Sequence, residues 1–201
     1  MAAQAALKTS GANDTRQRLI DVAAQLFSRH SFAGTSLQMI ADELGVTKAA
    51  VYHHFRSREE LLTAVVDPIL GQLRAALEKA EAQRTSHARA EHMLTGYTAL
   101  AVRNRTLVGV LAADPTVIEM LRSQGDLEDL ITRQVALLAD LDPGPPGRVK
   151  AAVVLAGIAG AVGSTGTDLD DDTLRQYLVE AGRRTLGLRA PRRSVSARRS
   201  R

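Results

Sequence analysis

Polar side chains that could contact a nucleic acid are concentrated in and beside the segment SLQMIADELGVTKAAVYHHF, which begins at Ser36. Lys48 can donate to a guanine edge or to a phosphate, and Ala49 lets a helix come close to a thymine methyl group. Tyr52 and His53 offer a phenol and an imidazole to phosphates or bases. The nine predicted contacts to double-stranded DNA are Thr35, Ser36, Gln38, Thr47, Lys48, Ala49, Tyr52, His53 and Arg58.

Capping residues divide this segment into two short helices, 37–44 and 48–55. Ser36 and Thr47 can each accept a free backbone N–H at a helix start, and Gly45 tolerates the left-handed conformation that ends a helix sharply. The apolar residues of both helices fall on one side. The segment therefore predicts a helix-turn-helix, whose second helix enters the major groove of DNA.

Arg58 stands in the first turn of the next helix, after a capping box formed by Ser57 and Glu60. The helix dipole favours acids at this position, so a base there suggests a phosphate outside the chain. Two simpler readings stay open. A helix-turn-helix also occurs in proteins that bind no DNA, and an exposed tyrosine or histidine is usually ordinary surface.

Helical periodicity extends along the chain, and no run of alternating β-branched residues predicts a strand. The sequence therefore predicts an all-α fold of about nine helices. Asp67-Pro68 predicts a kink or a new helix start, because proline removes a backbone donor. The expected helices span 15–29, 37–44, 48–55, 58–84, 87–104, 106–122, 126–141, 147–164 and 170–187.

Composition narrows the function classes. The chain has 201 residues and no cysteine, which excludes disulfides and cysteine-based metal or redox sites. The apolar stretch 151–163 is shorter than the roughly 20 residues that span a bilayer, so we expect a cytoplasmic protein without membrane contact. We find no catalytic constellation, cofactor loop or metal-ligand spacing, and we expect neither an enzyme nor a cofactor.

The net charge of +4 is unevenly distributed. Six arginines and no acid follow residue 188, which leaves 20 basic and 22 acidic residues in the rest of the chain. Affinity for DNA must therefore come from a local basic patch, from the tail, or from both.

Residues 15–66 resemble the tetracycline-repressor (TetR) family of bacterial regulators. Two departures are Ser31, where the family usually has glycine, and Arg58, where it usually has lysine. The matching elements are Ile20, Ala23-Ala24, Leu26-Phe27, Thr35-Ser36, Ile40-Ala41, Gly45-Val46-Thr47, the run from Val51 to Phe55, and the run from Ser57 to Leu62.

The resemblance implies DNA contacts for seven of the nine predicted residues (all except Thr35 and Ser36), a homodimer, and release of DNA when a small molecule binds a C-terminal helical bundle. Activators also occur in the family, so repression is the majority expectation. The predicted parts are a flexible arm (1–12), a helix-turn-helix domain (13–66), a ligand-sensing and dimerisation domain (67–188) and a disordered Arg-rich tail (189–201).

The last two helices are the expected dimer interface, because small residues let helix backbones approach closely; packing within one subunit is the alternative. The interface candidates are Ala152, Ala156, Gly160, Gly163, Leu174 and Leu178. The candidates for the ligand pocket are Tyr97, Leu100, Arg103, Leu107, Leu111, Leu121 and Leu130. Alternatively, the apolar candidates belong to the hydrophobic core and line no pocket. Arg103 could hold an anionic group of the ligand, or it could be an ordinary solvated surface residue.

The leading hypothesis is thus a dimeric DNA-binding regulator that recognises a palindromic operator and responds to an unidentified small-molecule ligand. The alternative is a helical interaction protein controlled by a protein partner, with the Arg-rich tail as its contact to nucleic acid or a membrane surface.

Overall fold

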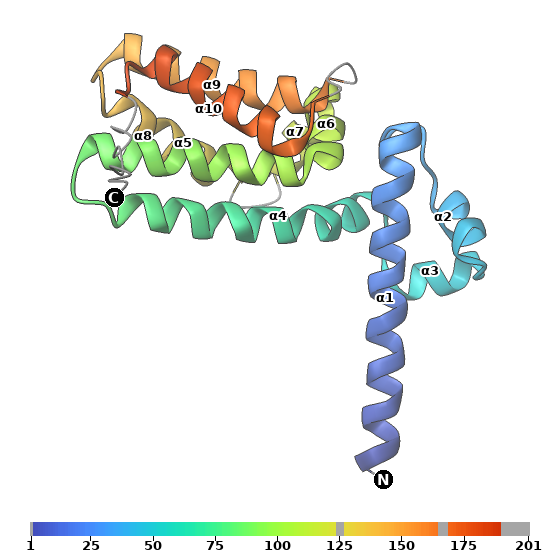
Figure 1. The fold of residues 1–201 in the computed structure, drawn as a ribbon. Helices are drawn as coiled ribbons and strands as arrows, with labels where there is room; N and C mark the ends of the chain where they lie inside the picture. The colour runs from blue at the N-terminus through green and yellow to red at the C-terminus, as the bar shows by residue number, and fades with distance from the viewer. Residues whose placement is uncertain (1, 124–126, 165–168, 190–201) are drawn as a thin grey trace, which may run out of the picture.

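The computed structural model describes residues 2–123, 127–164 and 169–189, and within these ranges it contains only helices (Figure 1). The all-α prediction is confirmed. The predicted Arg-rich tail lies outside the described residues except for Arg189. The helices are α1 (Ala2–His30), α2 (Leu37–Leu44), α3 (Lys48–His54), α4 (Arg58–Glu81), α5 (Ser86–Arg103), α6 (Arg105–Ala113), α7 (Pro115–Ser123), α8 (Leu127–Ala139), α9 (Pro145–Gly163) and α10 (Asp171–Leu186).

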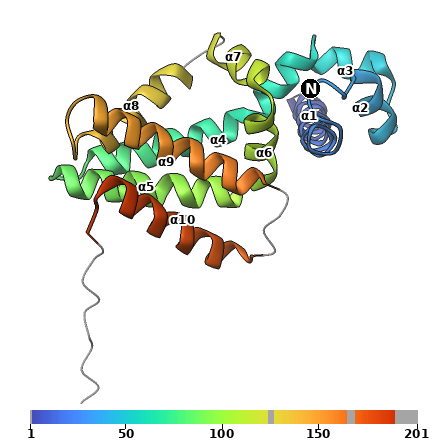
Figure 2. The ribbon, with the colours of Figure 1, turned by 90° about the horizontal axis from the view of Figure 1, so that it is seen from above.

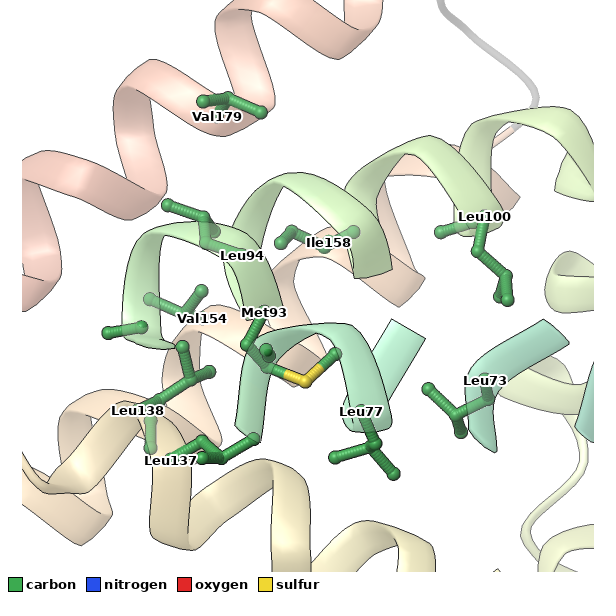
Figure 3. Packing of buried hydrophobic residues seen from close by; sticks show 14 of the residues in the cluster. Leu73, Leu77, Met93, Leu94, Leu100, Leu137, Leu138, Val154, Ile158 and Val179 are labelled. Atoms are coloured by element: carbon green, nitrogen blue, oxygen red, sulfur yellow. The ribbon is translucent and has the colours of Figure 1, made fainter. Parts of the chain in front are cut away.

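Two hydrophobic cores organise these helices. The N-terminal core surrounds Phe27 and Phe55 and joins α1, α2 and α3 to the first half of α4. The C-terminal core surrounds Leu77, Met93 and Leu138 and joins the second half of α4 to α5, α8, α9 and α10 (Figure 3). The predicted domain boundary near residue 66 therefore falls inside a helix that both cores share.

Helix α4 runs without interruption through Pro68, so the predicted new helix start is wrong. Asp67 and Pro68 both lie on the exposed side of the helix, where the proline ring meets solvent. The residues before them, Val65 and Val66, are buried in the N-terminal core, and Ile69 is buried in the C-terminal core. Burial on both sides of the proline holds the helix together.

The N-terminal arm also differs from expectation, because α1 begins at Ala2 rather than near Thr15. Residues 2–8 read AAQAALK and consist of strong helix formers. Nothing in residues 2–8 stops a helix that has begun further along the chain, and α1 includes residues 2–12; the flexibility of this arm stays a prediction.

The helix expected over 106–122 is divided into α6 and α7, which accounts for ten helices in the described residues rather than nine. Pro115 holds Asp114 in an extended conformation. The Asp114 carboxylate then accepts hydrogen bonds from the Thr116 N–H (3.0 Å) and hydroxyl (2.6 Å). These bonds begin a new helix and lower the pKa of Asp114.

The turn between α1 and α2 is under steric constraint. Ser31 adopts a positive φ of 62°, at the position where the resembling family usually has glycine. Three residues later, a Cβ added to Gly34 would lie 2.1 Å from the His30 carbonyl oxygen. This contact is with backbone, so only glycine fits at residue 34.

We predict that Gly34→Ala lowers the free energy of unfolding by about 1–3 kcal/mol, because the backbone must move to relieve the overlap. The matched control is Gly71→Ala, on α4, where an added Cβ meets nothing within 4 Å. This control should raise the free energy of unfolding by about 0.5–1 kcal/mol through helix propensity. Urea unfolding followed by circular dichroism measures both, and equal values for the two variants would contradict the assigned turn geometry.

Candidate nucleic-acid interface

Helix α2 lies between its two predicted capping residues, and α3 begins at its predicted cap and ends at His54, one residue before the predicted end. The Ser36 hydroxyl accepts from the Met39 N–H and the Thr47 hydroxyl accepts from the Ala50 N–H, each at 3.2 Å. Gly45 has a φ of 69°, in the left-handed region. The turn between α2 and α3 is therefore three residues long and fixed at both ends, and the predicted helix-turn-helix is confirmed.

Burial separates the two sides of this unit. Ile40 and Ala41 of α2 and Val51 of α3 are fully buried. The side chains on the opposite side of α3, which include Lys48 and Tyr52, are exposed. Because the inner residues cannot rotate outward without opening the core, the outer side of α3 is presented rigidly.

A cleft of about 380 Å³ lies between the α2 and α3 helix starts and the start of α4. It brings together six of the nine predicted residues and adds Leu37, Arg56 and Ser57. The predicted residues that line it are Thr35, Ser36, Gln38, Lys48, Tyr52 and Arg58. The other three, Thr47, Ala49 and His53, are exposed at or on α3.

Thr35 does not offer its side chain to a partner. It is 1% exposed, and its hydroxyl donates to the carbonyl oxygens of Leu26 (3.2 Å) and Ser31 (2.8 Å). The predicted contact through this hydroxyl is therefore wrong. These two hydrogen bonds stabilise the turn that follows α1.

Arg58 also has a role that the sequence did not reveal. One terminal nitrogen of its guanidinium donates to the carbonyl oxygens of Phe32 (3.0 Å), Ala33 (3.1 Å) and Thr35 (2.9 Å). The guanidinium carbon also lies 4.3 Å from the centre of the Phe32 ring. The carbonyls of the α1–α2 turn explain a base at this helix start, so an external phosphate is not required to explain it.

The remaining outward groups are partly organised before any partner binds. Gln38 donates to Asp42 at 2.7 Å, and the Lys48 ammonium lies 5.8 Å from the centre of the Tyr52 ring. His53 packs edge-on against His54. Burial, followed by the nearby charges of His53 and Arg16, lowers the pKa of His54, so His54 favours the neutral form.

Arg56 is a functional candidate that the sequence reasoning missed. It is exposed and lines the cleft with Lys48 and Tyr52. Its backbone N–H donates to the Glu60 carboxylate at 2.7 Å, so that carboxylate reaches one residue further back than a capping box with Ser57 requires. The available signal was a second base directly after the second helix.

The seven predicted pocket residues lie in different parts of the structure. Leu100 and Leu130 belong to the C-terminal core, whereas Leu121 belongs to the N-terminal core. Arg103 is exposed. A cleft of about 730 Å³ lies elsewhere, between the end of α1, α6 and the end of α9, and none of the seven lines it. Helical spacing could not show that α7 packs on the N-terminal core.

The predicted dimer residues are also divided. Leu174 is buried in the C-terminal core of its own chain, and Gly163 packs against Gly109, whose Cα lies 2.8 Å from an added Cβ. Burial within its own chain contradicts the assignment of Leu174 to the interface, whereas the half-buried Gly163 stays a candidate. Leu178 is half-buried against the same core, whereas Ala152, Ala156 and Gly160 are exposed on α9.

Comparison with known proteins finds similar sequences for the N-terminal domain. Residues 19–65 match the family model described as bacterial regulatory proteins, tetR family. The chain is 39% identical over 59 residues to an uncharacterised helix-turn-helix regulator, YerO, of Bacillus subtilis. This alignment covers 29% of this chain and 20% of that protein. The chain is also 37% identical over 70 residues to the transcriptional repressor KstR2 of Rhodococcus jostii. That alignment covers 33% of this chain and 34% of the relative. The chain thus aligns with about a fifth to a third of the length of these curated relatives.

Solved structures resemble the chain over most of its length. A TetR-family regulator from Streptomyces coelicolor, SCO3833, matches with a TM-score of 0.67 at 21% identity, covering 86% of this chain and 91% of that one. The ketosteroid regulator KstR2 of Mycobacterium tuberculosis matches with a TM-score of 0.66 at 20% identity, covering 86% and 93%. At these identities the likeness establishes the fold.

We predict that Arg58→Ala lowers the free energy of unfolding by about 1.5–3 kcal/mol, because it leaves three carbonyl oxygens of the α1–α2 turn without their charged donor. Arg58→Lys should give an intermediate loss, since it keeps the charge but not the planar stacking on Phe32. Arg56→Ala, at an exposed neighbour, should change stability by no more than about 0.5 kcal/mol. Thermal unfolding tests all three, and an unchanged midpoint for Arg58→Ala would show that the carbonyl contacts are not structural.

Proposed function

Since residues 19–65 match the family model described as bacterial regulatory proteins, tetR family, we propose that the chain is a DNA-binding transcriptional regulator of that family that acts as a homodimer in the bacterial cytoplasm. It represses transcription until a small-molecule ligand binds its C-terminal domain. The observation that carries this proposal is the rigid outer side of α3, where exposed Lys48 and Tyr52 meet Ser36 and Arg56 around one cleft.

The chemistry of this surface suits DNA. Lys48 and Arg56 supply positive charge for phosphates, and Tyr52 supplies a hydroxyl. The N-termini of α2 and α3 add backbone N–H groups, which favour phosphate oxygens. Helix α3 is exposed along one side, and the diameter of an α-helix suits the width of a major groove.

The exposed side of α9 supports the dimer. Val149 and Val153 are 62% and 57% exposed, and Tyr177 of α10 is 56% exposed. Further along α9, Gly157 and Gly160 have open space where a Cβ would stand. Glycine inside a helix costs up to about 1 kcal/mol relative to alanine, and a second backbone approaching closely would offset that cost.

Helix α9 is also, within the described ranges, the one helix long and apolar enough to cross a membrane, judged by length and composition alone. Core helices meet the same criterion. Its inner residues Ala151, Val154 and Ile158 are buried against neighbouring helices of this chain. Helix α9 thus has one buried and one exposed apolar side, which suits a helix that lies between two packed layers. We assign the outer layer to a second copy of this chain.

Helix α4 offers the route from ligand to DNA. Its second half is part of the C-terminal core, and its first residue, Arg58, holds the turn that precedes α2. A ligand that displaces the second half of α4 therefore moves the helix-turn-helix and alters the spacing of the two α3 helices in the dimer. The relative from Rhodococcus jostii is named a repressor, which favours repression over activation.

We predict that the purified protein binds a near-palindromic site in the DNA upstream of its own gene, with half-sites about 34 Å apart. Lys48→Ala should weaken binding and reduce the slope of log affinity against log salt by about 1, because one phosphate contact is lost. Tyr52→Ala should also weaken binding. Lys79→Ala, at the far end of α4, is the control and should leave affinity unchanged. Gel shifts at several salt concentrations measure these effects.

No preference for the upstream DNA over random duplex would contradict the proposal. Such a result would instead favour a helical interaction protein that is controlled by a protein partner.

We predict that Ala156→Arg converts the dimer to a monomer. An unpaired charge buried in an apolar interface costs about 3–5 kcal/mol, which weakens association at least ~100-fold. Ala136→Arg, at an exposed position on α8, is the matched control. Light scattering coupled to size-exclusion chromatography measures the mass, and a dimer in both variants would place the interface elsewhere.

A further inference from the structure

Three polar side chains are buried among the described residues: Thr35, Thr98 and Gln134. The two hydroxyls are satisfied, since Thr35 donates to Leu26 and Thr98 donates to the Leu94 carbonyl at 2.7 Å. The amide nitrogen of Gln134 has no hydrogen-bond partner in the described part of the chain. A buried donor without a partner is rare in native proteins and needs an explanation.

Gln134 lies in the interior of the C-terminal domain. It is 3% exposed and stands on α8, one turn from Leu130 on one side and from Leu138 on the other. Helix α8 packs against α4, α5 and α9. The amide is therefore surrounded by the helices that form the C-terminal core, away from the DNA-binding surface.

Tyr97 of α5 lies close to the same level. Helices α5 and α8 run in opposite directions (Figure 2), and the ion pair between Arg89 and Asp140 (2.6 Å) fixes their alignment. Counting 1.5 Å per residue from that pair places Gln134 level with residue 95, two residues from Tyr97. The Tyr97 hydroxyl donates to the Leu155 carbonyl of α9 at 3.3 Å, so its donor is already engaged. Burial raises the pKa of Tyr97 to about 12, and the phenol stays neutral.

The chemistry of the site selects its ligand. No charged side chain is buried in the described part of the chain, and Arg103 is exposed. A carboxylate beside Gln134 would therefore be an unpaired buried charge, which is strongly unfavourable. A neutral carbonyl oxygen accepts the same hydrogen bond without that penalty. The surrounding core side chains are mainly leucine, valine and alanine.

We propose that Gln134 is the hydrogen-bonding anchor of a ligand site within the C-terminal core, and that the effector is a mainly aliphatic molecule with a neutral carbonyl group, such as a ketone, ester or lactone. The inference rests on the proposed function, because it specifies the ligand of the sensor domain. In this site the ligand carbonyl accepts from the Gln134 amide, where α8 packs against α4, α5 and α9.

The first test needs no ligand. Gln134→Met keeps the side-chain length and removes the unpaired donor, so the midpoint of thermal unfolding should rise by about 2 °C or more. Gln72→Met, at an exposed position on α4, should leave it unchanged. A midpoint that falls in Gln134→Met would show that the amide already has a partner, and would overturn the proposal.

The second test uses 2-undecanone, methyl decanoate and γ-undecalactone as probes, with undecane and undecanoate as controls. The three carbonyl compounds should stabilise the wild-type dimer against heat more than either control does. In Gln134→Met their affinity should fall about tenfold or more, to that of undecane, while Gln72→Met responds as wild type. Equal responses to ketone and alkane, or a stronger response to undecanoate, would overturn the proposal.

Gel shifts with the upstream DNA separate this inference from the proposed function. If the carbonyl probes bind through Gln134 but do not release DNA, the ligand assignment stands and the release mechanism fails. If DNA binding is absent while the probes still distinguish Gln134→Met from wild type, the regulator assignment fails and the site remains.

Discussion

The structure depends above all on the burial of α4 in both hydrophobic cores. Leu61 and Val65 lie in the N-terminal core, and Leu73 and Leu77 lie in the C-terminal core. Because one continuous helix connects these groups, a shift in either core displaces side chains in the other or breaks backbone hydrogen bonds at the helix centre. The two domains are thus linked mechanically, and Arg58 extends the linkage to the turn before α2.

The hydrogen-bonding groups near the helix-turn-helix are partly used inside the chain and partly left exposed. Hydroxyls at Ser36, Thr47 and Ser57 satisfy the helix starts, and the Thr35 hydroxyl is used inside the turn. On the outer side, Lys48, Tyr52 and Arg56 remain exposed. Within the C-terminal core the balance is different, since Gln134 is the buried group that the described chain leaves unpaired. Both candidate sites rest on polar groups that the fold leaves without an internal partner.

Local signals predicted well where a short segment decides its own conformation. The α2 bounds and the caps at Ser36, Gly45 and Thr47 could be placed because capping is an interaction between neighbours in sequence. The same reasoning failed for Leu174 and Leu121. An amphipathic pattern shows that a residue is buried, but not against which helix, and these two leucines face cores other than the predicted surfaces.

The sequence by itself determined the all-α fold, the helix-turn-helix and the outward side of its second helix, because periodicity and capping depend on residues a few positions apart. Only the tertiary structure decided that Arg58 binds the carbonyls of a turn 23–26 residues earlier. It alone showed that α7 joins the N-terminal core, and that Gln134 is buried without a partner. Those outcomes depend on which helices meet in space, and residues distant in sequence supply the contacts that no local pattern encodes.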